Sequence, residues 1–224
     1  MGMVVSRSRS LGERHPMIGP MLYLSSLQYF IIQVLVSLRW SPPYSLSRDT
    51  ISDLGNTACA RFNGRYVCSP LHELMNVSFI LLGLTMIAGS ILVGPVVARR
   101  RAGSLGFVWM AVGGIGVVVV GLFPENSVPL FHGIGATLPF LIGNAGVVLI
   151  GITAELAPVL RGVTLCAGLV SLAALVFYAS GHYGGLGEGG IERIVAYPQT
   201  VWLILLGTHL SIMVKRRTSG SARS

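Results

Sequence analysis

The chain has 224 residues, of which 52% are hydrophobic and 11% are charged, and its mean hydropathy is +0.72. A soluble domain carries about 25% charged residues, so this composition excludes an ordinary water-soluble globule. The formal net charge is +8, but the basic residues form short clusters beside apolar runs rather than a stripe with interleaved aromatic residues. That distribution is typical of membrane topology signals, and we expect no nucleic-acid partner.

Apolar runs long enough to form membrane helices recur along the chain, since about 20 apolar residues cross the hydrocarbon layer. The first run follows a basic segment, residues 1–16, and no small-residue cleavage site follows the run, so we expect an uncleaved span. We predict an all-α fold, a polytopic six-helix membrane bundle over residues 17–214, with spans at about 17–38, 71–93, 105–123, 132–152, 162–180 and 195–214.

The distribution of arginine and lysine predicts that both termini face the cytoplasm. With that orientation, eleven of the 16 basic residues lie on the inner side and five on the outer side, as the positive-inside rule expects. The main contributions come from residues 99–101 and from the basic tail at 215–224. The longest connection, residues 39–70, then faces outward, and loops of this length are usually functional or self-packed.

The outer loop contains two cysteines, Cys59 and Cys68. An extracytoplasmic location permits a disulfide between them, which would close a small loop, and we expect this bond. The alternative is two free thiols. Asp53 in the same loop precedes Leu-Gly-Asn, a pattern that an ordinary turn or a helix cap also explains.

Ionisable residues interrupt the apolar sequence between the third and fourth spans, where residues 121–135 read GLFPENSVPLFHGIG. A short turn with hydrated side chains would explain Glu125 and His132 without any functional role. The functional alternative is that both side chains point inward, toward Asp53 and toward His72 at the start of the second span. An ionisable residue inside a membrane bundle is a functional hypothesis by default, and we take these four residues as candidate catalytic groups.

Four further polar residues are candidate ligand contacts in an outer pocket: Asn76, Asn144, His182 and Tyr197. Asn144 lies near the middle of its span, where an interhelical hydrogen bond is the more common role for asparagine. His72, His132 and Glu125 are weak candidates for a zinc site, because imidazole and carboxylate groups bind zinc. The chain lacks the HExxH spacing, and we expect no cofactor. A Ser-His-Asp site using Ser52 is weaker still, because no nucleophile-elbow motif is present.

The stretches ISDLGN, YVCSPLHELMN, FPEN, FHGIGA and FLIGNAG resemble the DUF998 family over about residues 20–212. The resemblance implies six helices in a bacterial plasma membrane and brings no established activity. A looser similarity in layout to Frag1/DRAM/Sfk1-type proteins suggests a lipid-related role by analogy alone. The positions that carry the resemblance are Asp53, Gly55, Asn56, Cys59, Cys68, His72, Asn76, Pro124, Glu125, His132, Gly133 and Asn144.

Three functions remain open from the sequence. The first is binding of a lipid or other amphiphile through an outward-facing polar pocket, with membrane lipids as partners. The second is an intramembrane enzyme, a hydrolase or a lipid- or isoprenoid-modifying enzyme, that uses Glu125 or Asp53 with His132 or His72 in acid-base or metal chemistry. The third is a small-solute or proton-coupled transporter, which the scarcity of charge at mid-membrane depth disfavours.

Overall fold

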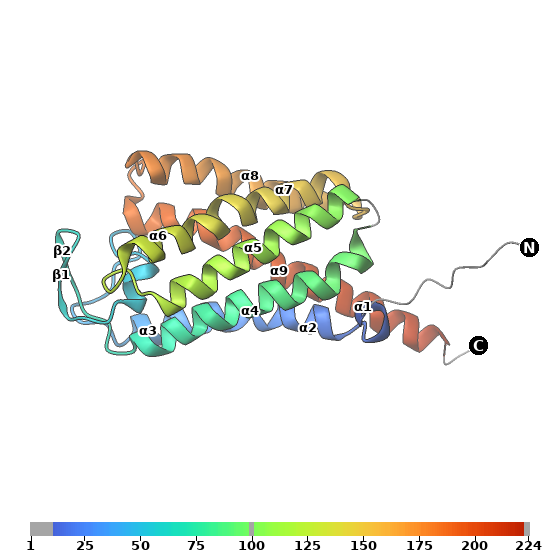
Figure 1. Cartoon of the computed structure of the whole chain (residues 1–224), viewed down its shortest axis with the longest axis horizontal. Coiled ribbons are helices and arrows are strands. Elements are labelled where there is room, and N and C mark those ends of the chain that lie inside the picture. Colours follow the sequence, from blue (N-terminus) through green and yellow to red (C-terminus); the bar gives the residue numbers. More distant parts are fainter. Residues whose placement is uncertain (1–10, 99–100, 222–224) are drawn as a thin grey trace, which may run out of the picture.

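The computed structural model describes residues 11–98 and 101–221 and is built almost entirely from helices (Figure 1). Several residues used in the topology prediction, at 1–10, 99–100 and 222–224, lie outside this range. The helices are α1 Leu11–Arg14, α2 Ile18–Ser25, α3 Leu27–Ser37, α4 His72–Val97, α5 Arg101–Leu122, α6 Pro129–Thr137, α7 Asn144–Thr153, α8 Pro158–Ser180 and α9 Gly187–Ser221, with a π-helical turn, η2 Leu138–Gly143, joining α6 to α7.

Five segments of the described chain are long and apolar enough to cross a membrane, at 18–37, 72–97, 101–122, 129–153 and 158–180. The chain is therefore an all-α polytopic membrane protein. The expected sixth span, residues 195–214, lies inside α9, which is not among these five. That the chain crosses the membrane six times consequently stays a prediction.

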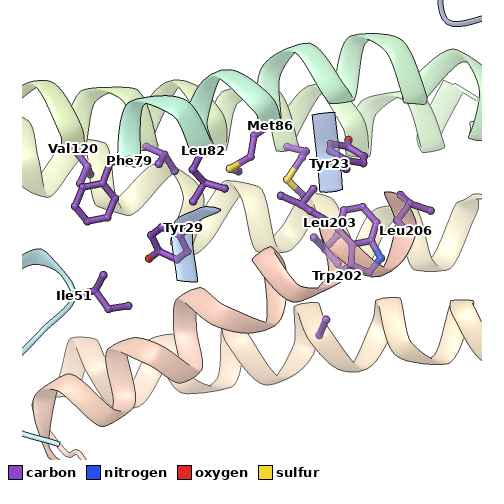
Figure 2. Packing of buried hydrophobic residues seen from close by; sticks show 14 of the residues in the cluster. Tyr23, Tyr29, Ile51, Phe79, Leu82, Met86, Val120, Trp202, Leu203 and Leu206 are labelled. Carbon is purple, nitrogen blue, oxygen red and sulfur yellow. The ribbon is translucent and has the colours of Figure 1, made fainter. Parts of the chain in front are cut away.

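Small residues allow the helices to approach closely. A Cβ atom on Gly83 of α4 would lie 2.5 Å from the carbonyl oxygen of Gly114 on α5, and a Cβ atom on Gly114 would lie 2.7 Å from that of Gly83. Such contacts replace the hydrophobic driving force that is missing between helices in lipid. Large side chains fill the remaining interior, where Tyr23, Trp202 and Leu206 pack together (Figure 2).

The connections at 38–71, 123–128 and 181–186 lie together at one end of the bundle, here called the loop end (Figure 1). The first connection contains a 3-10 helix, η1 Ser52–Gly55, and an antiparallel hairpin of β1 Ala60–Phe62 with β2 Arg65–Val67. Asn63 and Gly64 turn the hairpin with positive φ angles of 45° and 77°, as Asn-Gly turns usually do. Cys59 and Cys68 flank the paired strands, and a disulfide joins them.

The start of α9 holds the first connection against the bundle. Arg193 is 8% exposed and donates hydrogen bonds to the carbonyl oxygens of Leu46 and Asp49 and to the Tyr44 hydroxyl. Glycine permits this approach, because a Cβ atom on Gly189 would lie 2.2 Å from the Asp49 carbonyl oxygen. The same contacts set the position of η1, which contains Ser52.

Candidate functional site

A cavity of about 50 Å³ lies inside the bundle beside η1 and is here called the bundle cavity. On the same measure, one water molecule needs roughly 10–15 Å³, so the cavity holds a few groups of that size. Its walls are mainly apolar and come from α3, α4, α5, α6, η2 and α9. Figure 2 shows six of the lining side chains: Tyr29, Ile51, Phe79, Leu82, Met86 and Val120.

Polar atoms lie at the two ends of the bundle cavity. Ser52, Glu192 and Tyr29 line it toward the loop end, and Gln199 and Thr200 line it farther along α9. Glu192 and Gln199 are seven residues apart, which corresponds to ~10 Å along a helix. The Tyr29 side chain is only 3% exposed.

Ser52 connects Glu192 to His132, and these three residues are here called the serine relay. The Ser52 Oγ atom lies 3.1 Å from His132 Nε2 and 3.2 Å from Glu192 Oε1. The other ring nitrogen of His132, Nδ1, lies 3.0 Å from the carbonyl oxygen of Phe123. A carbonyl oxygen can only accept a hydrogen bond, so Nδ1 carries a proton. Glu192 is anchored on its other side, where Oε2 accepts from the Ile51 backbone N–H.

The protonation state of Glu192 decides in which direction the Ser52 hydroxyl donates its proton. The two contacts of Ser52 Oγ require two protons, and the second lies on Glu192 or on His132 Nε2. Glu192 is 2% exposed and His132 is 8% exposed, and burial disfavours separated charges. Burial raises the pKa of Glu192 to about 7 despite its hydrogen bond from Ile51. In its ionised form, Glu192 accepts at Oε1 from the Ser52 hydroxyl. A protonated Glu192 can instead donate to Ser52, which leaves the Ser52 proton for His132 Nε2.

A second polar group, here called the carboxylate cluster, consists of Asp53, Glu125 and Arg65. Asp53 follows Ser52 in η1 and is fully buried. Its Oδ2 atom accepts hydrogen bonds from Arg65 Nε at 2.9 Å and Nη2 at 2.7 Å. Arg65 also donates from Nη1 to Glu188 at 2.8 Å. This charge-assisted geometry ties the β2 strand to η1 and to the start of α9.

Glu125 completes the carboxylate cluster. Burial and the Asp53 carboxylate both raise the pKa of Glu125, while a hydrogen bond from Asn56 at 3.3 Å lowers it. Among the described residues, Asp53 Oδ1 is buried without a hydrogen-bond partner. A proton on Glu125 would supply a donor to Asp53, since two carboxyl groups share a hydrogen bond only when one is protonated.

The structure therefore divides the four candidate catalytic residues among three places. Asp53 and Glu125 meet in the carboxylate cluster, and His132 belongs to the serine relay. No hydrogen bond in the described part of the chain joins His72 to any of these three, and its Nδ1 atom is buried without a partner. Their catalytic roles stay predictions.

The candidate ligand contacts lie outside the bundle cavity. Asn76 donates to the Gly55 carbonyl oxygen at 2.9 Å, and Asn144 donates to the Val195 carbonyl oxygen at 3.2 Å. Tyr197 donates to Gln33 Oε1 at 2.8 Å, and His182 is exposed at the loop end. The first three contacts join one element to another. Within residues 11–98 and 101–221, no group of three His, Cys, Asp or Glu side chains could hold a metal ion.

Two members of the serine relay were missed or undervalued from the sequence. From the sequence, Ser52 belongs only to a weak Ser-His-Asp hypothesis, and Glu192 has no assigned role. One signal was present: Thr50-Ile-Ser-Asp53 matches a capping box. In the structure, Thr50 Oγ1 accepts from the Asp53 N–H at 3.0 Å and Asp53 Oδ2 accepts from the Thr50 N–H at 2.8 Å. That reciprocal pair begins η1 and places Ser52 within it.

Comparison with known proteins places the chain in a family without assigning an activity. The family model described as "Protein of unknown function (DUF998)" matches residues 23–209, which confirms the resemblance seen in the sequence motifs. No curated protein and no solved structure matches the chain. The site can thus be interpreted only from its own geometry. Because the match covers most of its length, the chain belongs to the DUF998 family.

Proposed function

We propose that this membrane protein binds a single-chain amphiphile in the bundle cavity, with the polar group of the amphiphile beside Ser52 and Glu192. The make-up of the cavity carries the proposal most directly, because apolar walls enclose a space that the polar side chains of Ser52, Glu192 and Tyr29 border. Apolar walls with a few convergent polar atoms are typical of sites for small amphiphilic ligands.

The size and surroundings of the bundle cavity narrow the class of ligand. A volume of about 50 Å³ accommodates only a few non-hydrogen atoms, such as a small polar group at the end of one chain, and is too small for a two-chain lipid. Ala136, Phe140 and Ala196 line the cavity and keep partial exposure. They belong to α6, η2 and α9, so the chain of the amphiphile would extend into the bilayer between these helices.

We further propose that α9 supplies a sixth span, that the loop end faces outward, and that both termini are cytoplasmic in a bacterial plasma membrane. The disulfide at the loop end supports this orientation, since disulfides persist in oxidising compartments. Arg101, Arg161 and Lys215 support it too, because they lie toward the opposite end of the bundle. Membrane lipids would then surround the bundle and supply the ligand.

Photocrosslinking tests the proposal directly. The full chain in lipid nanodiscs is exposed to a single-chain amphiphile with a neutral glycerol head and a diazirine in its chain, and the labelled peptides are mapped by mass spectrometry. We expect labels on cavity-lining residues that an excess of unmodified amphiphile removes. Ala196→Leu should reduce this labelling by filling the cavity, and Ala173→Leu, on an exposed face of α8, should not. Labels confined to exposed helix faces would contradict the proposal.

A further inference from the structure

We infer that Ser52 is a nucleophile and His132 its general base, and that together they cleave an ester bond in an amphiphile held in the bundle cavity. This inference rests on the proposed function, because the cavity must hold the ester. The Ser52 Oγ atom borders the cavity and lies 3.1 Å from His132 Nε2. That distance is within the reach required for a base to take a proton from a nucleophile.

His132 is held in the protonation state that a base requires. Its Nδ1–H donates to the Phe123 carbonyl oxygen at 3.0 Å. In the neutral ring this leaves the lone pair on Nε2, the atom that faces Ser52. The Phe123 carbonyl oxygen thus performs the orienting role that a third residue has in other nucleophile-base pairs. The turn at residues 123–128 fixes this oxygen at the start of α6.

Glu192 lies on the other side of the nucleophile, where its Oε1 atom accepts from Ser52 in the ionised form and can donate in the protonated form. Its Oε2 atom is occupied by the Ile51 N–H, so only Oε1, 3.2 Å from Ser52 Oγ, can turn toward a ligand. When Ser52 attacks, a protonated Glu192 loses its acceptor and becomes free to donate to the oxygen of the tetrahedral intermediate. Such donors stabilise charge that develops in the transition state.

The reaction balances with water as the second substrate. Ser52 Oγ forms a bond to the ester carbonyl carbon while its proton moves to His132 Nε2. The bond from that carbon to the leaving oxygen then breaks, and the proton on Nε2 passes to the departing alcohol. Water attacks the acyl-serine and gives a proton to Nε2, the carbon–Oγ bond breaks, and Ser52 regains its proton. The products are a carboxylic acid and an alcohol.

A fluorophosphonate probe tests the nucleophile without knowledge of the natural ester. The full chain, purified in detergent, is treated with an alkyl fluorophosphonate, and the modified residue is located by mass spectrometry. We expect labelling at Ser52, none in Ser52→Ala, and a rate at least ~100-fold lower in His132→Gln, which keeps a polar side chain but takes no proton. Ser127→Ala is the matched control, because Ser127 is exposed in the turn and bonds only to Pro124.

The outcomes separate this inference from the proposed function. Thermal melting followed by circular dichroism identifies any variant that fails to fold, and hydrolysis of p-nitrophenyl butyrate by the wild type gives a second readout that needs no variant. Absence of both labelling and hydrolysis in the folded wild type would overturn the catalytic assignment. If the diazirine amphiphile still labelled the cavity in that case, binding would stand alone. Undiminished labelling of Ser52→Ala would also overturn the assignment.

Discussion

Two polar groups lie side by side at the loop end and have opposite electrostatic characters. The carboxylate cluster contains an ion pair, since Arg65 contacts Asp53 at 2.7 Å and Glu188 at 2.8 Å. The serine relay contains no such pair, and its hydrogen bonds are satisfied when all its members are neutral. Ser52 and Asp53 are consecutive residues of η1, so one turn of helix sends one side chain into each group.

The difference separates residues that hold the loop from residues that can act on a ligand. Arg65 is paired with Asp53, the Asp53 carboxylate acts on the pKa of Glu125, and none of the three lines the bundle cavity. Ser52 and Glu192 do line the bundle cavity. A proton can pass between these two side chains over a single hydrogen bond of 3.2 Å. We therefore assign stability mainly to the carboxylate cluster and chemistry to the serine relay, and three substitutions test this division.

Arg65→Met should have the largest effect on stability. It removes the partner of a fully buried carboxylate, and breaking a buried ion pair costs about 3 kcal/mol in the free energy of unfolding. Arg61→Met on β1 is the control, since Arg61 is exposed and has no ion-pair partner in the described chain. Denaturant unfolding in detergent measures both variants. Equal, small effects would show that the carboxylate cluster does not hold the loop.

Glu125→Gln should have a smaller effect that depends on pH. Because the folded-state pKa of Glu125 is raised, its protonated form stabilises the fold fully below the unfolded pKa of about 4.3 and loses this contribution as pH rises. Glutamine keeps an uncharged donor toward Asp53 at every pH. Relative to the wild type, the variant should become progressively more stable as the pH rises from 5 toward 9, by at most about 1.4 kcal/mol for each pH unit.

Thermal melting across that pH range measures the gain from Glu125→Gln. Glu73→Gln provides the control, because Glu73 is exposed in the first turn of α4. A variant curve parallel to that of the wild type from pH 5 to pH 9 would mean that Glu125 is ionised throughout, and the proton shared with Asp53 would then be absent.

Ser52→Ala should have the smallest effect on stability. The substitution removes one hydroxyl and leaves Glu192 Oε1 and His132 Nε2 without that partner, and the expected cost is about 1–2 kcal/mol. Covalent labelling by the fluorophosphonate should nevertheless disappear. Ser52→Ala is thus expected to affect reactivity more than stability, whereas Arg65→Met is expected to affect mainly stability. A loss of stability as large as that of Arg65→Met would instead identify Ser52 as a structural residue.

Much of the fold follows from local sequence. Apolar runs predict the membrane helices because lipid requires every backbone group to be satisfied within its own segment. α9 is harder to assign, since Gln199, Thr200 and His209 interrupt its apolar run. The polar side chains of Gln199 and Thr200 are instead accommodated inside the bundle, where both are at most 5% exposed.

The candidate site was predicted only in part because its contacts join distant segments. The motif residues Asp53 and Glu125 lie far apart in sequence, and the Asp53 carboxylate acts on the pKa of Glu125 in the folded chain. The approach of Glu192 to Ser52 depends on how the first connection folds over α9, with Arg193 as its anchor. Periodicity and motif spacing carry no information about that contact. His72 lies in one of the family motifs, but no hydrogen bond among the described residues joins it to the other three candidates. A shared position toward the outer side of the membrane therefore does not predict which side chains meet.

An experimental structure in lipid nanodiscs tests the central claim most directly. We predict elongated density in the bundle cavity, with its polar end within hydrogen-bonding distance of Ser52 Oγ or the Tyr29 hydroxyl and its chain leaving between α6 and α9. A cavity closed by its own side chains, or one occupied only by water bonded to Tyr29 and Glu192, would contradict the assignment of this site to an amphiphile.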